Sequence, residues 1–263
     1  MTRVRRILVA CDASPLSRAA IEAAAALAER QGAELDVLFV EDINVVNLLD
    51  HPLVHTYSKA GARRHRVGDE VIQKALELQV AAARAALDEV VGRRAIQGRF
   101  GVRRGKVDAE LMDAASAADL VLMGWCGRPD PGSKPRLGSV ARSLAQAAPT
   151  SVVLLRNAVT GPVMALWDGS EAAGRALAVA AVLAARDGGT VELLVPSTDV
   201  MDTADLEAQA VALLGPLGLV ARHRSAGPLP RLLARLDPDG ILVVPAGIDV
   251  ALDDIPCSVV VAR

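Results

Sequence analysis

The chain of 263 residues is 52% hydrophobic and 23% charged, with 29 Lys or Arg, 31 Asp or Glu and a formal net charge of −2. This balance is typical of a globular protein, and the near-zero charge argues against a protein that coats nucleic acid. No apolar run approaches the ~20 residues of a membrane-spanning helix, and the first one, residues 7–11, is too short for a secretory signal, so we expect a cytoplasmic protein.

Short apolar runs alternate with Ala-rich or amphipathic stretches through the first half of the chain. The first run is followed by Ser14, which offers an N-cap oxygen, and by Pro15, which suits the first position of a helix. Gly32 is expected to end that helix. In chain order, the predicted strands are residues 5–11, 34–40, 96–102, 120–123 and 151–155, and the predicted helices are residues 15–31, 69–91, 107–117 and 139–147.

The second half of the chain repeats the order of parts of the first. The closing segments 149–156 and 256–263 match as well, and stepwise changes of offset show that the second copy lacks about 35 residues in its middle and about 14 near its end. The chain is therefore interpreted as a tandem duplication. The residues matched at a constant offset of 156 are Asp12 and Asp168, Ser14 and Ser170, Leu27 and Leu183, Arg30 and Arg186, and Gly32 and Gly188.

Short strands that are apolar on both faces, with helices between them, indicate a parallel sheet covered by helices on each side. The predicted fold class is α/β, with two tandem, doubly wound, five-stranded parallel-sheet domains of Rossmann-like type, the second of them shortened. We place the domains at residues 1–157 and 158–263. Residues 42–68 are less regular, and their basic cluster at residues 63–66 fits a solvated face better than a specific anion or nucleic-acid site.

A glycine-rich segment follows the fourth predicted strand, at the edge of the sheet where doubly wound folds bind ligands. Gly124 and Gly127 open it, and Gly138 and Ser139 close it at the start of the next helix. Glycines let the backbone approach an anion, and free amides at a helix start suit phosphate. An ordinary glycine loop with a serine N-cap is the alternative. The basic residues nearby are Arg128, Lys134 and Arg136.

Two better-known phosphate loops do not fit the sequence. The position after the first strand, where a dinucleotide fold carries Gly-x-Gly-x-x-Gly, holds Cys-Asp-Ala-Ser at residues 11–14. Residues 127–134 approach the spacing of a P-loop, but they end in Gly-Ser-Lys instead of Gly-Lys-Ser, and Pro135 follows where a helix would begin. The chain is therefore not a P-loop NTPase.

Together these features resemble the universal stress protein family, in tandem form, over nearly the whole chain apart from residues 42–68. The resemblance is carried by the Asp-x-Ser at Asp12, the Gly-x-x-Gly at Gly124, the Leu-Gly-Ser-Val-Ala of residues 137–141 and the final Pro-x-Ser-Val-Val-Leu-Leu-Arg of residues 149–156. ATP-binding members of that family carry Gly-x2-Gly-x9-Gly-Ser/Thr. Here the second gap is ten residues, one more than that pattern.

The resemblance implies that the first domain binds ATP or a related adenine nucleotide, with Mg²⁺ as an optional companion. Asp12 and the adjacent backbone would contact the adenosine part, and Val40 would meet the adenine. The glycine segment would hold the ribose and the phosphates. The predicted nucleotide-binding residues are Ala10, Asp12, Val40, Met123, Gly124, Gly127, Arg128, Gly138, Ser139 and Val140.

The leading hypothesis is a stress-response protein in which the nucleotide is a ligand or switch. No residue resembles a dedicated general base, so we predict no enzyme, or at most slow ATP hydrolysis, and no catalytic residue. The alternative is a protein-interaction module of the same family that binds no nucleotide, which the extra loop residue favours. An adenylate-using enzyme on a related fold has least support, because no pyrophosphate loop follows the first strand.

The second copy has neither the glycine segment nor a basic residue after its strand at residues 241–244. We therefore expect a degenerate domain with a structural role and one nucleotide per chain. Because Asp168 persists in this copy, Asp12 by itself is weak support for binding, and a turn or helix-start role suits it equally. A side chain placed at Gly124 or Gly138 is expected to block the ligand without unfolding the protein.

Association is predicted through the final strand of each copy, residues 151–156 and 258–263, because family dimers form there and an apolar edge strand invites pairing. The two strands are expected to pair antiparallel within one chain, as an intramolecular pseudo-dimer. A homodimer is left open, and neither a membrane nor a nucleic-acid partner is expected.

The cysteines and histidines suggest no further site. The three cysteines are far apart and form no Cys-x-x-Cys pair, which excludes a disulfide scaffold and a zinc ribbon. Cys11 and Cys257 lie in apolar, strand-like runs and are expected to be core residues. His51 and His55 are four positions apart, but Pro52 lies between them and no third ligand is evident, so no metal site is predicted.

Overall fold

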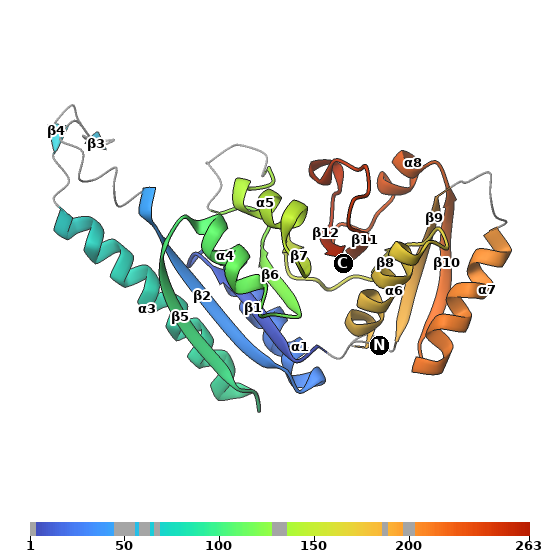
Figure 1. Cartoon of the computed structure of the whole chain (residues 1–263), viewed down its shortest axis with the longest axis horizontal. Helices are drawn as coiled ribbons and strands as arrows, with labels where there is room; N and C mark the ends of the chain where they lie inside the picture. Colours follow the sequence, from blue (N-terminus) through green and yellow to red (C-terminus); the bar gives the residue numbers. More distant parts are fainter. Residues whose placement is uncertain are drawn as a thin grey trace.

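Ten strands form one continuous sheet, in the order β10-β9-β8-β11-β12-β7-β6-β1-β2-β5. Each half of the chain supplies five neighbouring strands, so the halves lie side by side and meet at the centre of the sheet (Figure 1). The computed structural model describes residues 4–44, 56–57, 64–65, 69–127, 136–185, 189–196 and 203–263.

The first half contains every helix and strand that the sequence predicts there, with ends that differ by at most three residues. A separate antiparallel pair, β3 (Thr56–Tyr57) and β4 (Arg64–His65), falls within the excursion of residues 42–68. The strands in the large sheet are β1 (Arg6–Cys11), β2 (Glu34–Asp42), β5 (Gly98–Gly105), β6 (Leu120–Gly124) and β7 (Ser151–Leu155), and the helices are α1 (Pro15–Gln31), α3 (Asp69–Arg93), α4 (Val107–Ala115) and α5 (Ser139–Ala147).

The second half has the same strand order with shorter connections. A single 3-10 turn, η2 (Leu252–Asp254), stands before its last strand, where the first half has α5. The strands are β8 (Val163–Leu166), β9 (Thr190–Pro196), β10 (Val220–Gly227), β11 (Ile241–Pro245) and β12 (Ser258–Ala262), and the remaining helices are α6 (Glu171–Ala184), α7 (Thr203–Leu214), η1 (Gly215–Leu217) and α8 (Leu229–Leu233).

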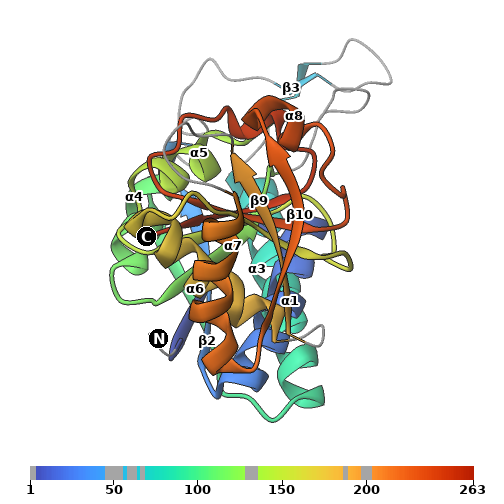
Figure 2. The same cartoon turned by 90° about the vertical axis from the view of Figure 1, so that its right-hand side faces the viewer.

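In the large sheet, all neighbouring strands within each half are parallel. Because side chains alternate across each strand, two apolar cores form on opposite faces of the sheet, and both continue through the two halves. One core is covered by α1, α3, α6 and α7, and the other by α4, α5 and α8. Figure 2 shows α7 lying along β9 and β10. The α/β class with a parallel-dominated sheet is thus the observed fold.

The caps of α1 explain where this helix begins and ends. The Ser14 hydroxyl accepts a hydrogen bond from the amide of Ser17 at 3.2 Å, and Pro15 occupies the first helical position. At the other end Gly32 adopts a left-handed φ of 63° and its amide donates to the carbonyl of Ala28. Each of these features was readable in the sequence.

The two halves join through β7 and β12, which pair antiparallel with Val153 opposite Val260. This is the pairing expected from the sequence, and it merges the two predicted sheets into one. Buried serines reinforce it symmetrically: the amide of Arg156 donates to Ser258 Oγ, and the amide of Arg263 donates to Ser151 Oγ, both at 3.1 Å. Pairing removes two apolar edges that would otherwise expose unsatisfied backbone groups.

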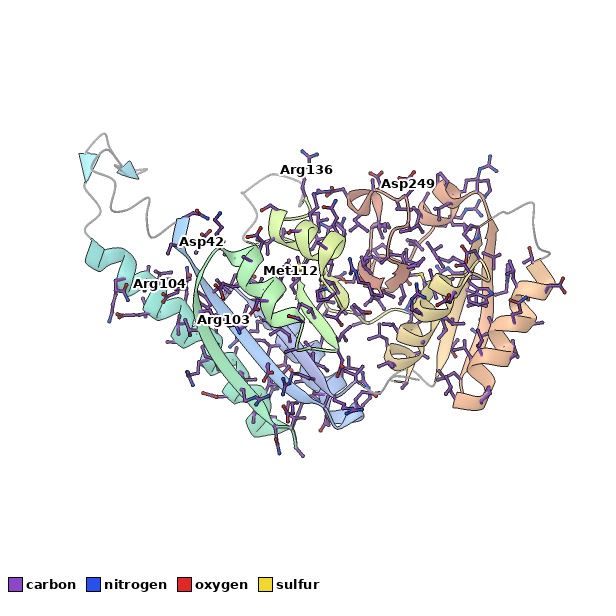
Figure 3. The ribbon with its side chains drawn as sticks, in the orientation of Figure 1. Asp42, Arg103, Arg104, Met112, Arg136 and Asp249 are labelled. Atoms are coloured by element: carbon purple, nitrogen blue, oxygen red, sulfur yellow. The ribbon has the colours of Figure 1, made fainter. Side chains whose placement is uncertain are left out.

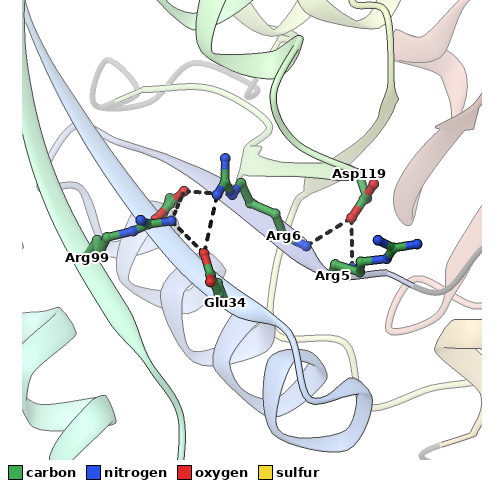
Figure 4. A network of polar contacts seen from close by, with 6 residues as sticks. Arg5, Arg6, Glu34, Arg99 and Asp119 are labelled. Carbon is green, nitrogen blue, oxygen red and sulfur yellow. Dashed lines mark hydrogen bonds and ion pairs between the residues drawn. The ribbon is translucent and has the colours of Figure 1, made fainter.

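At the amino ends of the first-half strands, charged groups hold the sheet in register (Figure 4). Asp119, in the turn before β6, accepts the amides of Arg5 and Arg6 at 2.7 and 2.9 Å. On the edge strand β5, Arg99 Nη2 lies 2.5 Å from Glu34 Oε2 of the neighbouring strand. These exposed ion pairs contribute little stability individually, but charges on an edge strand discourage pairing with another sheet.

We predict that Val260→Pro destabilises the protein more than Val260→Ala. Val260 is fully buried between Val243 of β11 and Val153 of β7. Alanine removes two methyl groups at a cost of about 2 kcal/mol. Proline also removes a ladder donor and introduces a steric clash, so its cost should reach about 3 kcal/mol or more. Urea denaturation measures the free energy of unfolding of both variants. Equal losses in the two would show that the backbone hydrogen bonds at the junction contribute nothing to stability.

Candidate functional site

A cavity of about 520 Å³ opens at the carboxyl ends of β1, β2 and β6. In strand order, β1 and β6 are the neighbours between which the chain reverses its direction of winding, so the cavity lies at the topological switch point of the first half. Arg128 lies outside the described residues. The other nine predicted site residues all line this cavity: Ala10, Asp12, Val40, Met123, Gly124, Gly127, Gly138, Ser139 and Val140.

The turn after β1 is held by the side chain of Asp12. Its Oδ1 accepts the amide of Ser14 at 2.9 Å, which places Ala13 in the left-handed region with a φ of 58°. The second half repeats the turn: Asp168 Oδ1 accepts the amide of Ser170 at 2.9 Å. This aspartate therefore has a structural role in both halves, and its persistence in the second copy needs no ligand.

The second carboxylate oxygen of Asp12 faces the glycine segment. A methyl group at Gly127 would lie 3.3 Å from Asp12 Oδ2, and Asp12 itself is exposed. The two oxygens thus have separate surroundings, one engaged by the turn and one directed across the cavity. A hydroxyl group of a ligand is a suitable hydrogen-bond donor to the second oxygen.

Gly124 has a packing role that was not predicted from the sequence. A methyl group there would lie 2.9 Å from Leu16 Cβ of α1 and 3.3 Å from the carbonyl oxygen of Cys126. Since neither neighbour is the end of a flexible side chain, a larger residue at Gly124 must separate α1 from β6. A larger residue at Gly124 is therefore expected to strain the packing of the fold as well as to obstruct the ligand, so Gly138 is the cleaner position for testing the site.

Gly138 offers the space that Gly124 lacks. A methyl group there would lie 3.5 Å from Cys126 Cα and 3.6 Å from the carbonyl oxygen of Trp125, which are ordinary contacts. Its φ of −60° is open to any residue, and as the N-cap of α5 it supplies no side-chain cap. The first amides of α5 are consequently not capped by that residue, and Ser139 and Val140 of this turn line the cavity.

Trp125 anchors the glycine segment at both of its described ends. Its amide donates to Leu155 of β7 at 2.7 Å, and its carbonyl accepts the amide of Gly138 at 3.0 Å. The ring is 1% exposed and stacks on the guanidinium of Arg156, whose Cζ lies 3.6 Å from the ring centroid. Burial lowers the pKa of Arg156. This pair was not predicted from the sequence, although Trp125 lies between two loop glycines and is one of only two tryptophans in the chain.

The inner wall of the cavity is apolar. Leu38 and Val40 come from β2, Leu111 from α4 and Leu76 from α3, and Gln79 lies one turn from Leu76. The sequence did not predict that residues of α3 and α4 line the cavity. The spacing of apolar residues shows which of them share one face of a helix, but it does not show which strand end that face contacts. At the rim, Figure 3 shows Asp42 at the end of β2 and Arg136 at the start of α5 along the same edge.

Two thiols also line the cavity, Cys11 and Cys126. Burial raises the pKa of each, so both are neutral at physiological pH. Cys11 is buried at the end of β1, as predicted, and its Sγ lies 3.5 Å from Ser17 Oγ. Cys257 is likewise a core residue, and burial raises its pKa to about 11.

The universal stress protein family model matches residues 3–156. The chain belongs to the universal stress protein family. A universal stress protein from Archaeoglobus fulgidus is 20% identical with a TM-score of 0.71, and the match covers 100% of this chain and 99% of that one. A protein of unknown function from Pseudomonas aeruginosa PAO1 is 16% identical with a TM-score of 0.55, covering 98% and 92%. At these identities the likeness establishes the fold alone. No curated protein sequence matches the chain.

The described residues of this universal stress protein contain neither a cluster of metal ligands nor a helix that could span a membrane. No three His, Cys, Asp or Glu side chains there come together as metal ligands, and His51 and His55 lie outside this part of the chain. None of the helices in the same part combines the length and apolar character that crossing a bilayer requires.

We predict that Ala13→Gly stabilises the protein by up to about 1 kcal/mol. A residue with a Cβ pays roughly 1–2 kcal/mol to adopt the left-handed conformation, and glycine removes this strain. Glycine also has more conformational freedom in the unfolded chain, which reduces the gain in stability by roughly 0.5–1 kcal/mol. Gly169 holds the equivalent turn position with a φ of 77°. The reciprocal change, Gly169→Ala, should therefore destabilise by a similar amount. Opposite shifts of the urea midpoint are expected, and shifts of the same sign would contradict the strain argument.

Proposed function

We propose that the first half binds an adenine nucleotide, ATP foremost, in the cavity at the switch point, and that this nucleotide is a ligand or switch for a cytoplasmic stress-response protein. The observation that supports this most is the convergence of residues from four separate segments. Residues chosen from sequence resemblance on β1, β2, β6 and α5 line one cavity of about 520 Å³.

The cavity offers a different chemistry to each part of a nucleotide. The start of α5 supplies backbone amides and the Ser139 hydroxyl, which suit the phosphates. The apolar wall of Leu38, Val40 and Leu111 suits a planar base, since such surfaces bury well against aliphatic side chains. Asp12 Oδ2 suits a ribose hydroxyl. Mg²⁺, when it accompanies ATP, would be held through the phosphates and water.

Slow turnover follows from the side chains at hand. Among the described residues of the cavity lining, the titratable groups are Asp12, Asp42, Cys11 and Cys126. Asp12 is engaged by the turn after β1, and burial keeps both thiols protonated. Neither thiol is therefore poised as a general base, and Asp42 Oδ1 accepts the amide of Asn44 at 2.8 Å. The proposed role is therefore binding, with at most slow hydrolysis.

A protein-interaction module without nucleotide is the second candidate. It is favoured by the ten-residue gap between Gly127 and Gly138. It is also favoured by the absence of Lys and Arg from the described lining, because two carboxylates alone would repel a triphosphate. Under this second candidate function, as under the nucleotide-binding one, the second half of the chain is a built-in structural partner that pairs through β7 and β12.

Isothermal titration calorimetry with ATP and Mg²⁺ tests the proposal. We predict a stoichiometry near one per chain, because the second half has η2 in place of a glycine segment and an α5. A stoichiometry near two would contradict the assignment of the site to the first half. The absence of binding would favour the interaction module.

We predict that Gly138→Val abolishes ATP binding while the protein remains folded. The new side chain meets no atom closer than ordinary contact at its Cβ, and Gly138 is the N-cap of α5, the helix start at which the proposed phosphates bind. Gly174→Val on α6 is the matched control, since no atom lies within 4 Å of a methyl group there. Circular dichroism verifies folding, and a folded Gly138→Val variant with wild-type affinity would exclude this segment as the site.

A further inference from the structure

The second half of the chain reaches the glycine segment of the first half through Asp253. This residue lies on η2, the short turn that replaces α5 in the second copy. Its Oδ1 accepts the amide of Leu137 at 2.8 Å, and its Oδ2 accepts a hydrogen bond from Arg142 Nη2 at 2.7 Å. Leu137 is buried and directly precedes Gly138, so the carboxylate acts at the residue before the α5 N-cap.

The charge of Asp253 is balanced where it lies. The amide of Leu137 and the guanidinium of Arg142 hold the pKa of this carboxyl below its usual range, with a smaller contribution from Arg136. The group is therefore ionised at neutral pH. Because Arg142 pairs with it on α5 itself, the carboxylate fixes the helix start without presenting a net negative charge to a phosphate at the same helix.

A second contact from η2 holds the other described end of the glycine segment. The guanidinium that stacks on Trp125 belongs to Arg156, and its Nη2 donates to the carbonyl oxygen of Asp253 at 3.2 Å. Trp125 Nε1 and Arg156 Nε find no hydrogen-bond partner among the described residues, so the position of these two side chains relies on the stack and on this one bond. Trp125 and Leu137, at the two described ends of the glycine segment, are thus both linked to η2, Leu137 directly and Trp125 through Arg156.

We propose that Asp253 is a positioning residue for the nucleotide site: by holding Leu137 it orients Gly138 and the first amides of α5 toward the phosphates. The inference rests on the proposed nucleotide function. It assigns the second half a direct part in the site, beyond that of a structural partner. In this proposal the positioning is done by Asp253 Oδ1, which accepts the amide of Leu137, and the ion pair with Arg142 contributes less.

The test compares ATP affinity, measured by calorimetry, in four full-length variants. Asp253→Ala removes the acceptor and should weaken binding about tenfold, as expected for the loss of a charged hydrogen bond. Asp253→Asn keeps an acceptor for the amide of Leu137 and should retain affinity within about threefold. Arg142→Ala removes only the ion pair and should resemble Asp253→Asn. Asp254→Ala is the control, because Asp254 is the exposed neighbour on the same turn.

Either of two results would overturn the proposal. One is wild-type affinity in a folded Asp253→Ala variant. The other is an equal loss in Asp253→Ala, Asp253→Asn and Arg142→Ala, which would assign the effect to the ion pair. If the substitutions acted only by destabilising the fold, the urea midpoint would fall and Asp253→Ala and Asp253→Asn would have the same ATP affinity, which also contradicts the proposal.

A measurement without nucleotide separates this proposal from the proposed function. Trp125 and Trp167 are the two tryptophans of the chain, so Trp167→Phe leaves Trp125 as the sole reporter. In that background, Asp253→Ala should red-shift the Trp125 emission and increase its quenching by acrylamide, while Asp254→Ala should not. If the wild type failed to bind ATP, the proposed function would be wrong, yet this shift would still show that Asp253 sets the segment. An unchanged spectrum would contradict the positioning role.

Discussion

The antiparallel pairing of β7 with β12 is the constraint on which the rest of the structure depends. It joins five strands from each half into one sheet and makes the apolar cores on both faces continuous through the molecule. It also brings the end of β7, with Arg156, next to η2 of the second half. The geometry around Trp125, Leu137 and Asp253 exists only because these two strands lie side by side.

The same constraint explains which parts of the second copy survive. The loop and helix before its last strand have been reduced to a single turn, yet β12 keeps five buried residues and a full parallel ladder to β11. A ligand loop can be lost without exposing apolar surface, because loops contribute little to a core. A central strand cannot, since its side chains pack alternately on both faces of the sheet and its backbone pairs with a neighbouring strand on each edge.

The sequence predicted local features well and relations between distant segments only in part. Caps such as Ser14 and Gly32 act within one turn of the chain, so their chemistry is legible in a short window. The rule that parallel strands present their carboxyl ends at one edge placed the glycine segment at a ligand-binding edge, and the resemblance to the family supplied the individual residues of the cavity. The close approach of Gly124 to Leu16, the Trp125–Arg156 stack and the Asp253 contacts depend on how a helix, a strand end and the second half meet in space. No periodicity or spacing in one dimension encodes those distances.

The junction also shows what covalent linkage permits. Two of its hydrogen bonds are related by symmetry, from Arg156 to Ser258 and from Arg263 to Ser151. In an assembly of two identical chains, every substitution enters both sides at once, so a residue that suits one side must be tolerated on the other. A fused chain is free of that requirement. Its two sides can diverge, and in this chain Asp253 of the second half contacts the start of α5, a helix that the second half itself does not possess.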